Sequence, residues 1–316
     1  MPPKIMTLDE IHEILPSLDL VTAIEQGFVA YSAGRAVVPP VGELVLEKGE
    51  VHIKYGYIQD QPYYVVKIAS GFYDNPKLGL PSSNGTMLLF EQQTGELISV
   101  LLDQGYLTDV RTAVAGAVVA KHLAPQHIER IGIVGTGIQA RLQLQYLASV
   151  TSCRDVLVWG RGERQLAQYR ADMEPLGFHV EATRDTTDVL QTCNLVVTAT
   201  PATEPLLHAS DLRAGTHITA VGADTPSKQE LEATILARAD LVIADSIAQC
   251  RHRGEIHKAL KRDAIVEDSV VELGEIIAGT KAGRSSDSQI TVADLTGVAV
   301  QDIQIASAVY EHAKCI

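Results

Sequence analysis

The chain of 316 residues contains no charge-free apolar run that approaches the roughly 18 residues of a membrane-spanning helix. It also contains no long uninterrupted run of lysines and arginines: acidic residues outnumber basic ones by 39 to 26, and the formal net charge is −13. The first six residues lack the apolar core of a signal peptide. We therefore expect a cytoplasmic protein without a membrane or nucleic acid as partner, because its charge repels phosphate backbones.

Cysteine is scarce, with Cys153, Cys193, Cys250 and Cys315 as the four members. None belongs to a Cys-x-x-Cys motif, and none lies beside a histidine at the spacing of metal ligands. We expect incidental or buried thiols in a reducing compartment, and neither a redox motif nor a metal site.

The first third of the chain has the pattern of an α+β domain. Two short helices are expected between residues 7 and 33, and Thr7 and Glu10 have the spacing of a capping box. Alternating, β-branched segments separated by turn residues then predict strands that pair in an antiparallel sheet. These strands are expected at residues 51–55, 63–68 and 85–90, followed by a helix at 108–123.

The middle of the chain alternates short apolar runs with helical stretches, which is typical of a doubly wound parallel sheet. The runs lie at residues 131–134, 156–159, 195–198, 218–221 and 241–244. A last helix at 300–314 has apolar positions suited to packing back on the first domain. The predicted fold class is α/β: a Rossmann domain, 118–297, inserted in an α+β antiparallel-sheet domain, 1–117 plus 298–316.

A dinucleotide fingerprint, Gly135-x-Gly137-x-x-Ala140, follows the run at 131–134 and opens a helix. Gly135 permits the tight turn, Gly137 leaves room for a pyrophosphate, and Ala140 lets helix and strand pack closely. The free N–H groups at the helix start favour an anion. The cofactor-binding residues expected here are Gly135, Thr136, Gly137, Ile138 and Gln139.

The end of the second strand predicts which dinucleotide binds. Enzymes that use NAD usually carry a carboxylate there for the ribose hydroxyls. This chain has Arg161, with Arg164 three residues on, and a planar guanidinium suits a 2′-phosphate. We therefore expect NADP(H) to be preferred, with NAD(H) possible; the alternative for Arg161 is a solvated loop arginine.

Four blocks of sequence together resemble the ornithine cyclodeaminase/μ-crystallin family. They are residues 107–113, the fingerprint, residues 220–231 and residues 286–292. The resemblance implies a homodimer whose interface is built by the antiparallel-sheet domain. Members act on a carbon that bears both a nitrogen and a carboxylate, as ornithine cyclodeaminases, ketimine reductases and some alanine dehydrogenases do.

The resemblance also implies roles for individual residues. Lys67 and Arg111 match the pair that holds the substrate carboxylate, and Asp224 matches the acid that exchanges a proton near the amino carbon. Ser82 matches a small hydroxyl residue beside substrate or nicotinamide, and Lys228 one that positions Asp224 or the cofactor. Further cofactor contacts are expected at Thr112, Thr198 and Val221. Without the resemblance, Lys67 could be an exposed strand lysine and Asp224 a helix N-cap.

Two departures from the family pattern bear on the substrate. Residues 37–43 lack the arginine that many members direct at the carboxylate. Lys54 stands near the place where ornithine-type members carry an acid for the distal ammonium, and a cation there repels that ammonium. Lys54 could instead bind substrate, replacing the arginine or pairing with a second carboxylate; the alternative is that it faces solvent.

We therefore expect NAD(P)H-dependent reduction of an α-imino acid, with Asp224, Lys67 and Arg111 as catalytic residues. One alternative is an ornithine cyclodeaminase-type lyase that forms proline and ammonia. Another is a non-catalytic, NADP-dependent binding protein for small molecules. The substrate side chain stays open between a cyclic imine, iminosuccinate, and pyruvate with an amine.

Overall fold

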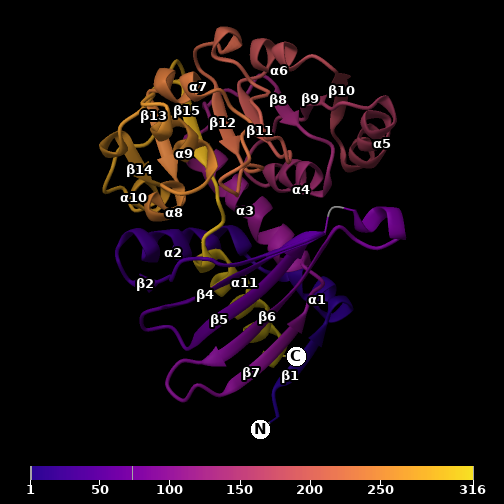
Figure 1. Ribbon diagram of the computed structural model, residues 1–316, viewed down its shortest axis with the longest axis vertical. Coiled ribbons are helices and arrows are strands. Elements are labelled where there is room, and N and C mark those ends of the chain that lie inside the picture. Colours follow the sequence, from indigo (N-terminus) through magenta and orange to yellow (C-terminus); the bar gives the residue numbers. More distant parts are fainter. Residues whose placement is uncertain (1, 73, 316) are drawn as a thin grey trace. The chain divides into compact units, whose positions relative to one another are not determined.

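The computed structural model describes residues 2–72 and 74–315, which form two compact units. The first unit contains Met1–Arg111 and Val298–Ile316, and the second contains Thr112–Gly297 (Figure 1). Both chain ends therefore belong to one unit, and the boundary before the second falls within helix α3 (Tyr106–Leu123). Within the described residues, no helix combines the length and apolar character that a membrane crossing requires.

The first unit is built on a seven-stranded sheet with the order β1-β7-β6-β5-β4-β2, in which β3 also pairs with β4. Its strands are β1 (Lys4–Thr7), β2 (Ala36–Val37), β3 (Gly42–Leu46), β4 (Gly49–Ile58), β5 (Tyr63–Gly71), β6 (Ser83–Glu91) and β7 (Leu97–Leu102). The three predicted strands lie within β4, β5 and β6. The sheet is mixed rather than purely antiparallel, because β1 pairs with β7 in parallel. At four residues, β1 is too short to show an alternating pattern.

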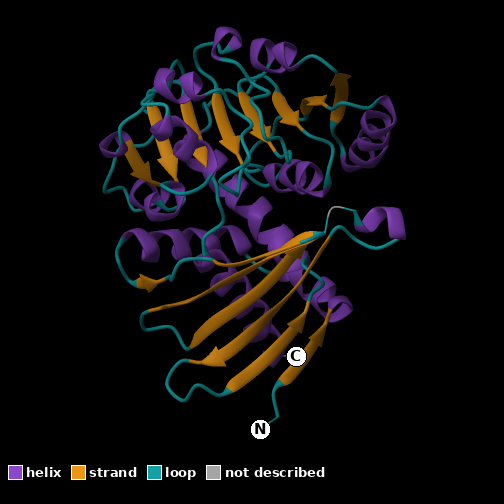
Figure 2. Ribbon diagram, in the orientation of Figure 1, coloured by secondary structure: helices purple, strands orange, loops and turns teal. Residues whose placement is uncertain are grey.

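Helices cover one face of this sheet (Figure 2). They are α1 (Leu8–Ile14), α2 (Leu20–Ser32) and the C-terminal α11 (Ala299–Cys315), with short 3₁₀ turns at Leu15–Ser17 and Asn75–Leu78. The capping box predicted at Thr7 and Glu10 is confirmed. Helix α11 packs on α2 and on β4 and β5, as predicted for the last helix. Alternate residues of β5 are therefore buried, and Lys67 is one of them.

The second unit contains an eight-stranded, entirely parallel sheet with the order β10-β9-β8-β11-β12-β15-β13-β14. Its strands are β8 (Ile131–Val134), β9 (Asp155–Trp159), β10 (His179–Thr183), β11 (Leu195–Thr198), β12 (His217–Ala220), β13 (Leu241–Ala244), β14 (Val270–Glu272) and β15 (Thr291–Asp294). The five predicted strands correspond to β8, β9, β11, β12 and β13, so the prediction of a Rossmann domain is confirmed. The order reverses between β8 and β11, where such sheets bind their ligands.

The helices of the second unit lie on both faces of its sheet (Figure 2). They are α4 (Ile138–Leu147), α5 (Glu163–Met173), α6 (Thr186–Thr192), α7 (Ala233–Arg238), α8 (Ile247–Cys250), α9 (Gly254–Lys261) and α10 (Leu273–Ile277), with 3₁₀ turns at Glu174–Leu176, Ala209–Asp211 and Glu267–Ser269. The central strands are buried along their whole length, which removes apolar area from water on both sides. Polar groups that could bind a ligand are therefore found mainly at the ends of these strands.

Candidate active site

Two lysines lie directly opposite each other in the sheet of the first unit. Lys54 on β4 pairs in register with Lys67 on β5, and both are buried, with 7% and 1% of their surface exposed. Arg111, at the end of the α3 segment that belongs to this unit, is buried as well. Like charges at facing positions repel each other, and a buried charge is costly without a partner. Three buried cations thus require a counter-charge.

Asp302, on α11, supplies that counter-charge. Lys67 Nζ lies 3.1 Å from Asp302 Oδ1 and from Oδ2, and Arg111 Nε lies 3.1 Å from Oδ1. The Lys67–Oδ1 contact is a hydrogen bond, whereas the Arg111 contact is an ion pair by distance alone. Arg111 Nη1 donates a hydrogen bond of 2.7 Å to Oε1 of the neighbouring Gln301. The two most buried cations are thereby held by one turn of α11.

The pKa shifts in this cluster follow from burial and mutual charge. Burial opposes ionisation of Asp302, but attraction to Lys67, Arg111 and Lys54 outweighs it and lowers the pKa of that carboxyl below its ordinary value. Burial, reinforced by repulsion from Arg111, lowers the pKa of Lys67 to about 8, although Asp302 opposes the shift. Burial raises the pKa of nearby Asp103, which weakens it as a further counter-charge. The cluster therefore carries more positive than negative charge, and an anion suits it.

The structure brings together three of the residues predicted to bind substrate, namely Lys54, Lys67 and Arg111, and separates Ser82 from them. Ser82 immediately precedes β6, and the adjacent Ser83 pairs with Gly71. Since Lys67 pairs with Met87, Ser82 lies five residues from the position opposite Lys67, which is about 16 Å along an extended chain.

The sequence analysis missed Asp302, Gln301 and Asp103. The signal for the first two was present, because Gln301 and Asp302 are adjacent polar residues in the first turn of a helix whose first two turns are otherwise apolar except for Gln304. A buried polar pair in such a helix requires partners on the element that it covers. Asp103 directly follows β7, and its Oδ2 accepts a hydrogen bond from Leu107 N, so it also fixes the start of α3.

In the second unit, the turn between β8 and α4 has the geometry of a dinucleotide site. Gly135 has φ +124°, and a Cβ there would lie 2.7 Å from the Ala199 carbonyl oxygen, so only glycine fits. A Cβ on Gly137 would meet no atom within 4 Å, which leaves open space beside the N-terminus of α4. Ala140 is fully buried against the strand. An anionic pyrophosphate fits this open, N–H-rich turn.

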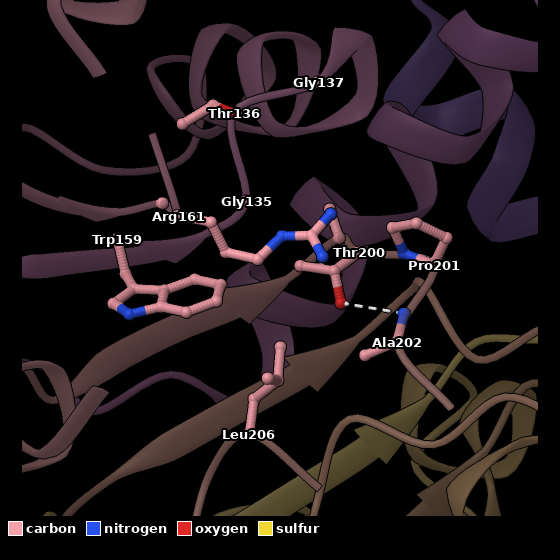
Figure 3. Close-up of a pocket in the computed structure, with 11 residues that line it drawn as sticks. Gly135, Thr136, Gly137, Trp159, Arg161, Thr200, Pro201, Ala202 and Leu206 are labelled. Atoms are coloured by element: carbon pink, nitrogen blue, oxygen red, sulfur yellow. Dashed lines mark hydrogen bonds between the residues drawn. The ribbon is translucent and has the colours of Figure 1, made fainter. Parts of the chain in front are cut away.

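A pocket opens at the ends of β8, β9 and β11 (Figure 3). Its lining consists of Gly135, Thr136, Gly137, Trp159, Gly160, Arg161, Ala199, Thr200, Pro201, Ala202 and Leu206. In Figure 3 the Arg161 side chain extends from the Trp159 side of the pocket in the direction of Thr200. None of these lining residues carries a carboxylate. Arg164 is exposed on the first turn of α5 and does not belong to the lining.

Asp224 and Lys228 lie on the loop that follows β12. Lys228 Nζ is 2.6 Å from Asp224 Oδ1, and the Asp224 side chain is 40% exposed. Arg253 Nη1 donates to the backbone carbonyl of Asp224 over 3.3 Å. The ion pair fixes the position of the carboxylate while leaving it accessible.

The other predicted cofactor contacts have different surroundings. The Thr198 hydroxyl donates to Glu230, and Val221 N donates to the Thr198 carbonyl, so both groups serve the fold. The backbone carbonyl of Thr112 accepts from Gln143. Ile138 is 57% exposed at the start of α4, and the neighbouring Gln139 is partly buried.

Comparison with known proteins gives a consistent result. The sequence profile of the ornithine cyclodeaminase/mu-crystallin family matches residues 2–315. A protein of Sinorhizobium fredii named uncharacterized cyclodeaminase y4tK is 45% identical, over 98% of this chain and 96% of its own.

Two solved structures share the whole fold. An archaeal alanine dehydrogenase dimer with bound NAD has a TM-score of 0.92 at 33% identity, and the match covers 100% of this chain and 97% of that one. The Δ1-pyrroline-2-carboxylate reductase of Thermococcus litoralis, in complex with NADH and L-proline, has a TM-score of 0.93 at 26% identity. This second match covers 98% of this chain and 97% of that one.

We predict that Asp302→Asn destabilises the protein by about 3 kcal/mol or more at pH 7, because it leaves buried cations without their counter-charge. The measurement is the free energy of unfolding from a denaturant titration. The matched control is Asp268→Asn, an exposed aspartate of the second unit, which should change stability by less than about 0.5 kcal/mol. Equal stabilities of the two variants would contradict the assignment of Asp302 as the counter-charge.

Proposed function

Because this chain belongs to the ornithine cyclodeaminase/mu-crystallin family, we propose that it reduces a C=N bond adjacent to a carboxylate, with a nicotinamide dinucleotide as hydride donor. The observation that carries the proposal is that two buried cations, Lys67 and Arg111, share the Asp302 carboxylate, with the buried Lys54 in register beside Lys67. A substrate carboxylate would add a second negative charge to these cations. The reverse reaction oxidises an α-amino acid to its imine.

The first unit acts in this proposal as the substrate domain. Lys67 and Arg111 hold the α-carboxylate through charge-assisted hydrogen bonds, which are stronger than neutral ones. Asp302 keeps both cations in place through its ion pairs with them. A lysine ammonium or an arginine guanidinium has several N–H donors, so each cation can also donate to a second anion. Lys54 adds charge for the same carboxylate or for a second one. Fixing the carboxylate orients the imine carbon, which is the main contribution that binding makes to hydride transfer.

The second unit holds the dinucleotide, which when bound supplies a hydride to the imine carbon. The Gly135 turn and the first N–H groups of α4 bind its pyrophosphate. Asp224 manages the proton that the imine nitrogen gains, and Lys228 holds that carboxylate at a fixed position. We retain Ser82, Thr112, Thr136, Ile138, Gln139, Thr198 and Val221 as proposed contacts to substrate or cofactor.

For the choice of dinucleotide, we propose a preference for NADP(H), with NAD(H) as a possible substitute. Arg161 belongs to the pocket lining, and no lining residue offers a carboxylate to a 2′-hydroxyl. The two solved relatives described above carry NAD or NADH, so the proposed preference for NADP(H) depends on Arg161. Arg164 would contribute only by a movement of its exposed side chain.

We also propose that the protein is a homodimer through the sheet face opposite α11. Strand register places a set of exposed apolar side chains on that face: Ile5, Leu44, Leu46, Tyr55, Ile68 and Leu102. A contiguous exposed apolar surface of this kind marks an interaction site. The archaeal alanine dehydrogenase with the same fold is described as a dimer.

The second candidate function is cyclodeamination, and the 45% identity to a protein named a cyclodeaminase favours it. Its first step is the same oxidation to an imine, but a distal amine then displaces ammonia and the hydride returns. Lys54 disfavours this reaction, because a buried cation beside Lys67 repels a distal ammonium. A non-catalytic binding protein, the third candidate, has no need for the accessible Asp224 carboxylate paired with Lys228.

We predict net oxidation of NADPH or NADH when the protein is mixed with a cyclic α-imino acid or with a keto acid and ammonia. The measurement is the absorbance of the reduced nicotinamide across a panel of such substrates. Lys67→Ala should raise KM for the imino or keto acid tenfold or more, because it removes a hydrogen bond to a charged group worth about 1.5–3 kcal/mol. Lys48→Ala, on the exposed turn between β3 and β4, is the matched control and should leave KM unchanged.

Two results would contradict the proposed function. Ammonia release from ornithine with only catalytic amounts of cofactor, and no net oxidation with any imine, would establish the cyclodeaminase reaction instead. Binding of dinucleotide without turnover of any substrate, unaltered by Asp224→Asn, would establish the binding protein.

We predict that kcat/KM for the imino acid falls as the pH rises above about 8. The pKa of Lys67 is lowered to about 8, so this ammonium loses its proton at higher pH and with it the attraction for the carboxylate. The measurement is kcat/KM between pH 6 and 10, which reports groups of the free enzyme. Lys67→Arg, whose guanidinium stays charged, should move the fall to higher pH; a fall at the same pH in both proteins would assign it to another group.

We predict that Arg161→Ala lowers kcat/KM with NADPH tenfold or more and changes kcat/KM with NADH by less than about twofold. The reason is that the guanidinium pairs with the 2′-phosphate, which NADH lacks. The measurement is the ratio of the two values, with Arg164→Ala as control at an exposed position outside the pocket lining. A preference for NADH in the unaltered protein that persists in Arg161→Ala would contradict the NADP(H) preference.

A further inference from the structure

The buried carboxylate of Glu230 joins the ends of two neighbouring strands in the second unit. Its Oε1 accepts hydrogen bonds of 2.7 Å from both the backbone N and the hydroxyl of Thr200, which follows β11. Its Oε2 accepts from the Thr198 hydroxyl at 2.7 Å and from Gly222 N, after β12, at 2.8 Å. Glu230 itself is fully buried. One side chain thus accepts from four donors, which belong to the last residue of β11 and to the loops that follow β11 and β12.

The two loops have different roles in the proposed reaction. Thr200 lines the dinucleotide pocket, opposite the Trp159 side. Gly222 lies at the start of the loop that carries Asp224. A Cβ at Gly222 would lie 2.2 Å from Thr200 O, so the two backbone segments approach each other too closely for any residue but glycine. The wall of the pocket and the start of the Asp224 loop are therefore in direct contact at Glu230.

Glu230 is in turn held by the start of α9. Glu255 Oε1 accepts from Glu230 N at 2.6 Å, and Glu255 Oε2 accepts from Leu231 N at 3.2 Å. Arg253, which precedes α9, donates to the Asp224 carbonyl. The segment from Asp224 to Leu231 is thus anchored at both ends by the same turn.

We propose that Glu230 is a positioning residue for the dinucleotide: it holds the Thr200 wall of the pocket and the Asp224 loop in one fixed arrangement that binds the cofactor. The inference rests on the proposed function to the extent that the pocket takes a dinucleotide. Glu230 is not a lining residue of that pocket. It acts through Thr200 and Gly222.

A carboxylate is required at this position because each of its oxygens accepts two donors. A glutamine of the same shape has one oxygen and one NH₂ group, which donates and does not accept. Glu230→Gln therefore turns the NH₂ toward two donors, and Thr200 N or Gly222 N loses its partner. A buried N–H without an acceptor is costly, so the loop moves until water reaches it.

The charge of Glu230 is balanced between opposing effects. Burial raises its pKa to about 7, against the four hydrogen bonds, which favour the ionised form. The charged group facing it is Glu255, from α9, whose own pKa is raised to about 8 by burial and by Glu230. Glu255 is also repelled by the carboxylate of Asp294 on β15, and it is attracted by Lys258, which lies on α9 as well. As the pH falls through about 7, protonation removes acceptor capacity from Glu230, and the arrangement loosens.

The test is titration of the full-length protein with NADPH and with NADH by calorimetry, between pH 6 and 8. At pH 8, Glu230→Gln should weaken the affinity for the preferred dinucleotide by tenfold or more, as expected when hydrogen bonds to a charged group are lost. The affinity of the unaltered protein should fall more steeply between pH 8 and pH 6 than that of Glu230→Gln, in which Glu255 and the 2′-phosphate of NADPH still titrate. The matched control is Glu232→Gln, which alters a carboxylate two residues on that accepts from Ala209 N, and it should bind like the unaltered protein.

Each outcome of this experiment has a defined meaning. Equal affinities and equal pH dependence of Glu230→Gln and the unaltered protein would overturn the inference and leave the proposed function intact. If Glu230→Gln lacks a cooperative thermal transition, Glu255→Gln decides: it removes one acceptor from Glu230 N or Leu231 N, and unchanged affinity would overturn the inference. If the unaltered protein bound neither dinucleotide, the proposed function would fail and the inference with it.

Discussion

Two buried cations of the first unit, Lys67 and Arg111, share one carboxylate, Asp302, which also attracts Lys54. That carboxylate arrives on the last helix, more than 180 residues after Arg111 in the chain. The first unit is therefore incomplete until the C-terminal segment has returned to it, although the whole Rossmann unit lies between. The insertion of one domain in the other is tolerated because the returning helix contributes both apolar packing and the charge that the sheet requires.

The same charges limit how the interior of the first unit could be built. Replacing Lys54, Lys67 and Asp302 by apolar residues would remove the cost of burying charge, and such replacements are often neutral or stabilising. The chain instead keeps these charged residues buried, and a buried ion cluster is weak evidence for stability. In the proposed function, the substrate carboxylate is the ligand of opposite sign that this cluster binds.

The fold could be predicted from the sequence because the patterns that indicate it are local. Buried strands such as β8 appear as short apolar runs, and Gly135, Gly137 and Ala140 are fixed by the turn that they make. Sequence reasoning also found Lys54, Lys67 and Arg111, largely through resemblance to a family. It missed seven strands, all of six residues or fewer, namely β1, β2, β3, β7, β10, β14 and β15. It also missed Asp302, Gln301 and Glu230. The roles of these three polar residues depend on partners far along the chain, and no local pattern reports such a pairing.

The two buried acids that sequence reasoning missed differ in the sign of their pKa shift, and the difference follows from their neighbours. Asp302 lies among cations, whose attraction exceeds the cost of burial, so its pKa is lowered and its charge is permanent near neutral pH. Glu230 has only neutral donors and a second carboxylate, Glu255, so burial prevails and its pKa rises to about 7. A carboxylate such as Asp302, whose pKa is lowered, stays ionised near neutral pH and holds the neighbouring cations in place. A carboxylate such as Glu230, whose pKa is raised, gains a proton more readily near neutral pH, and this is why its proposed role is tested as a function of pH.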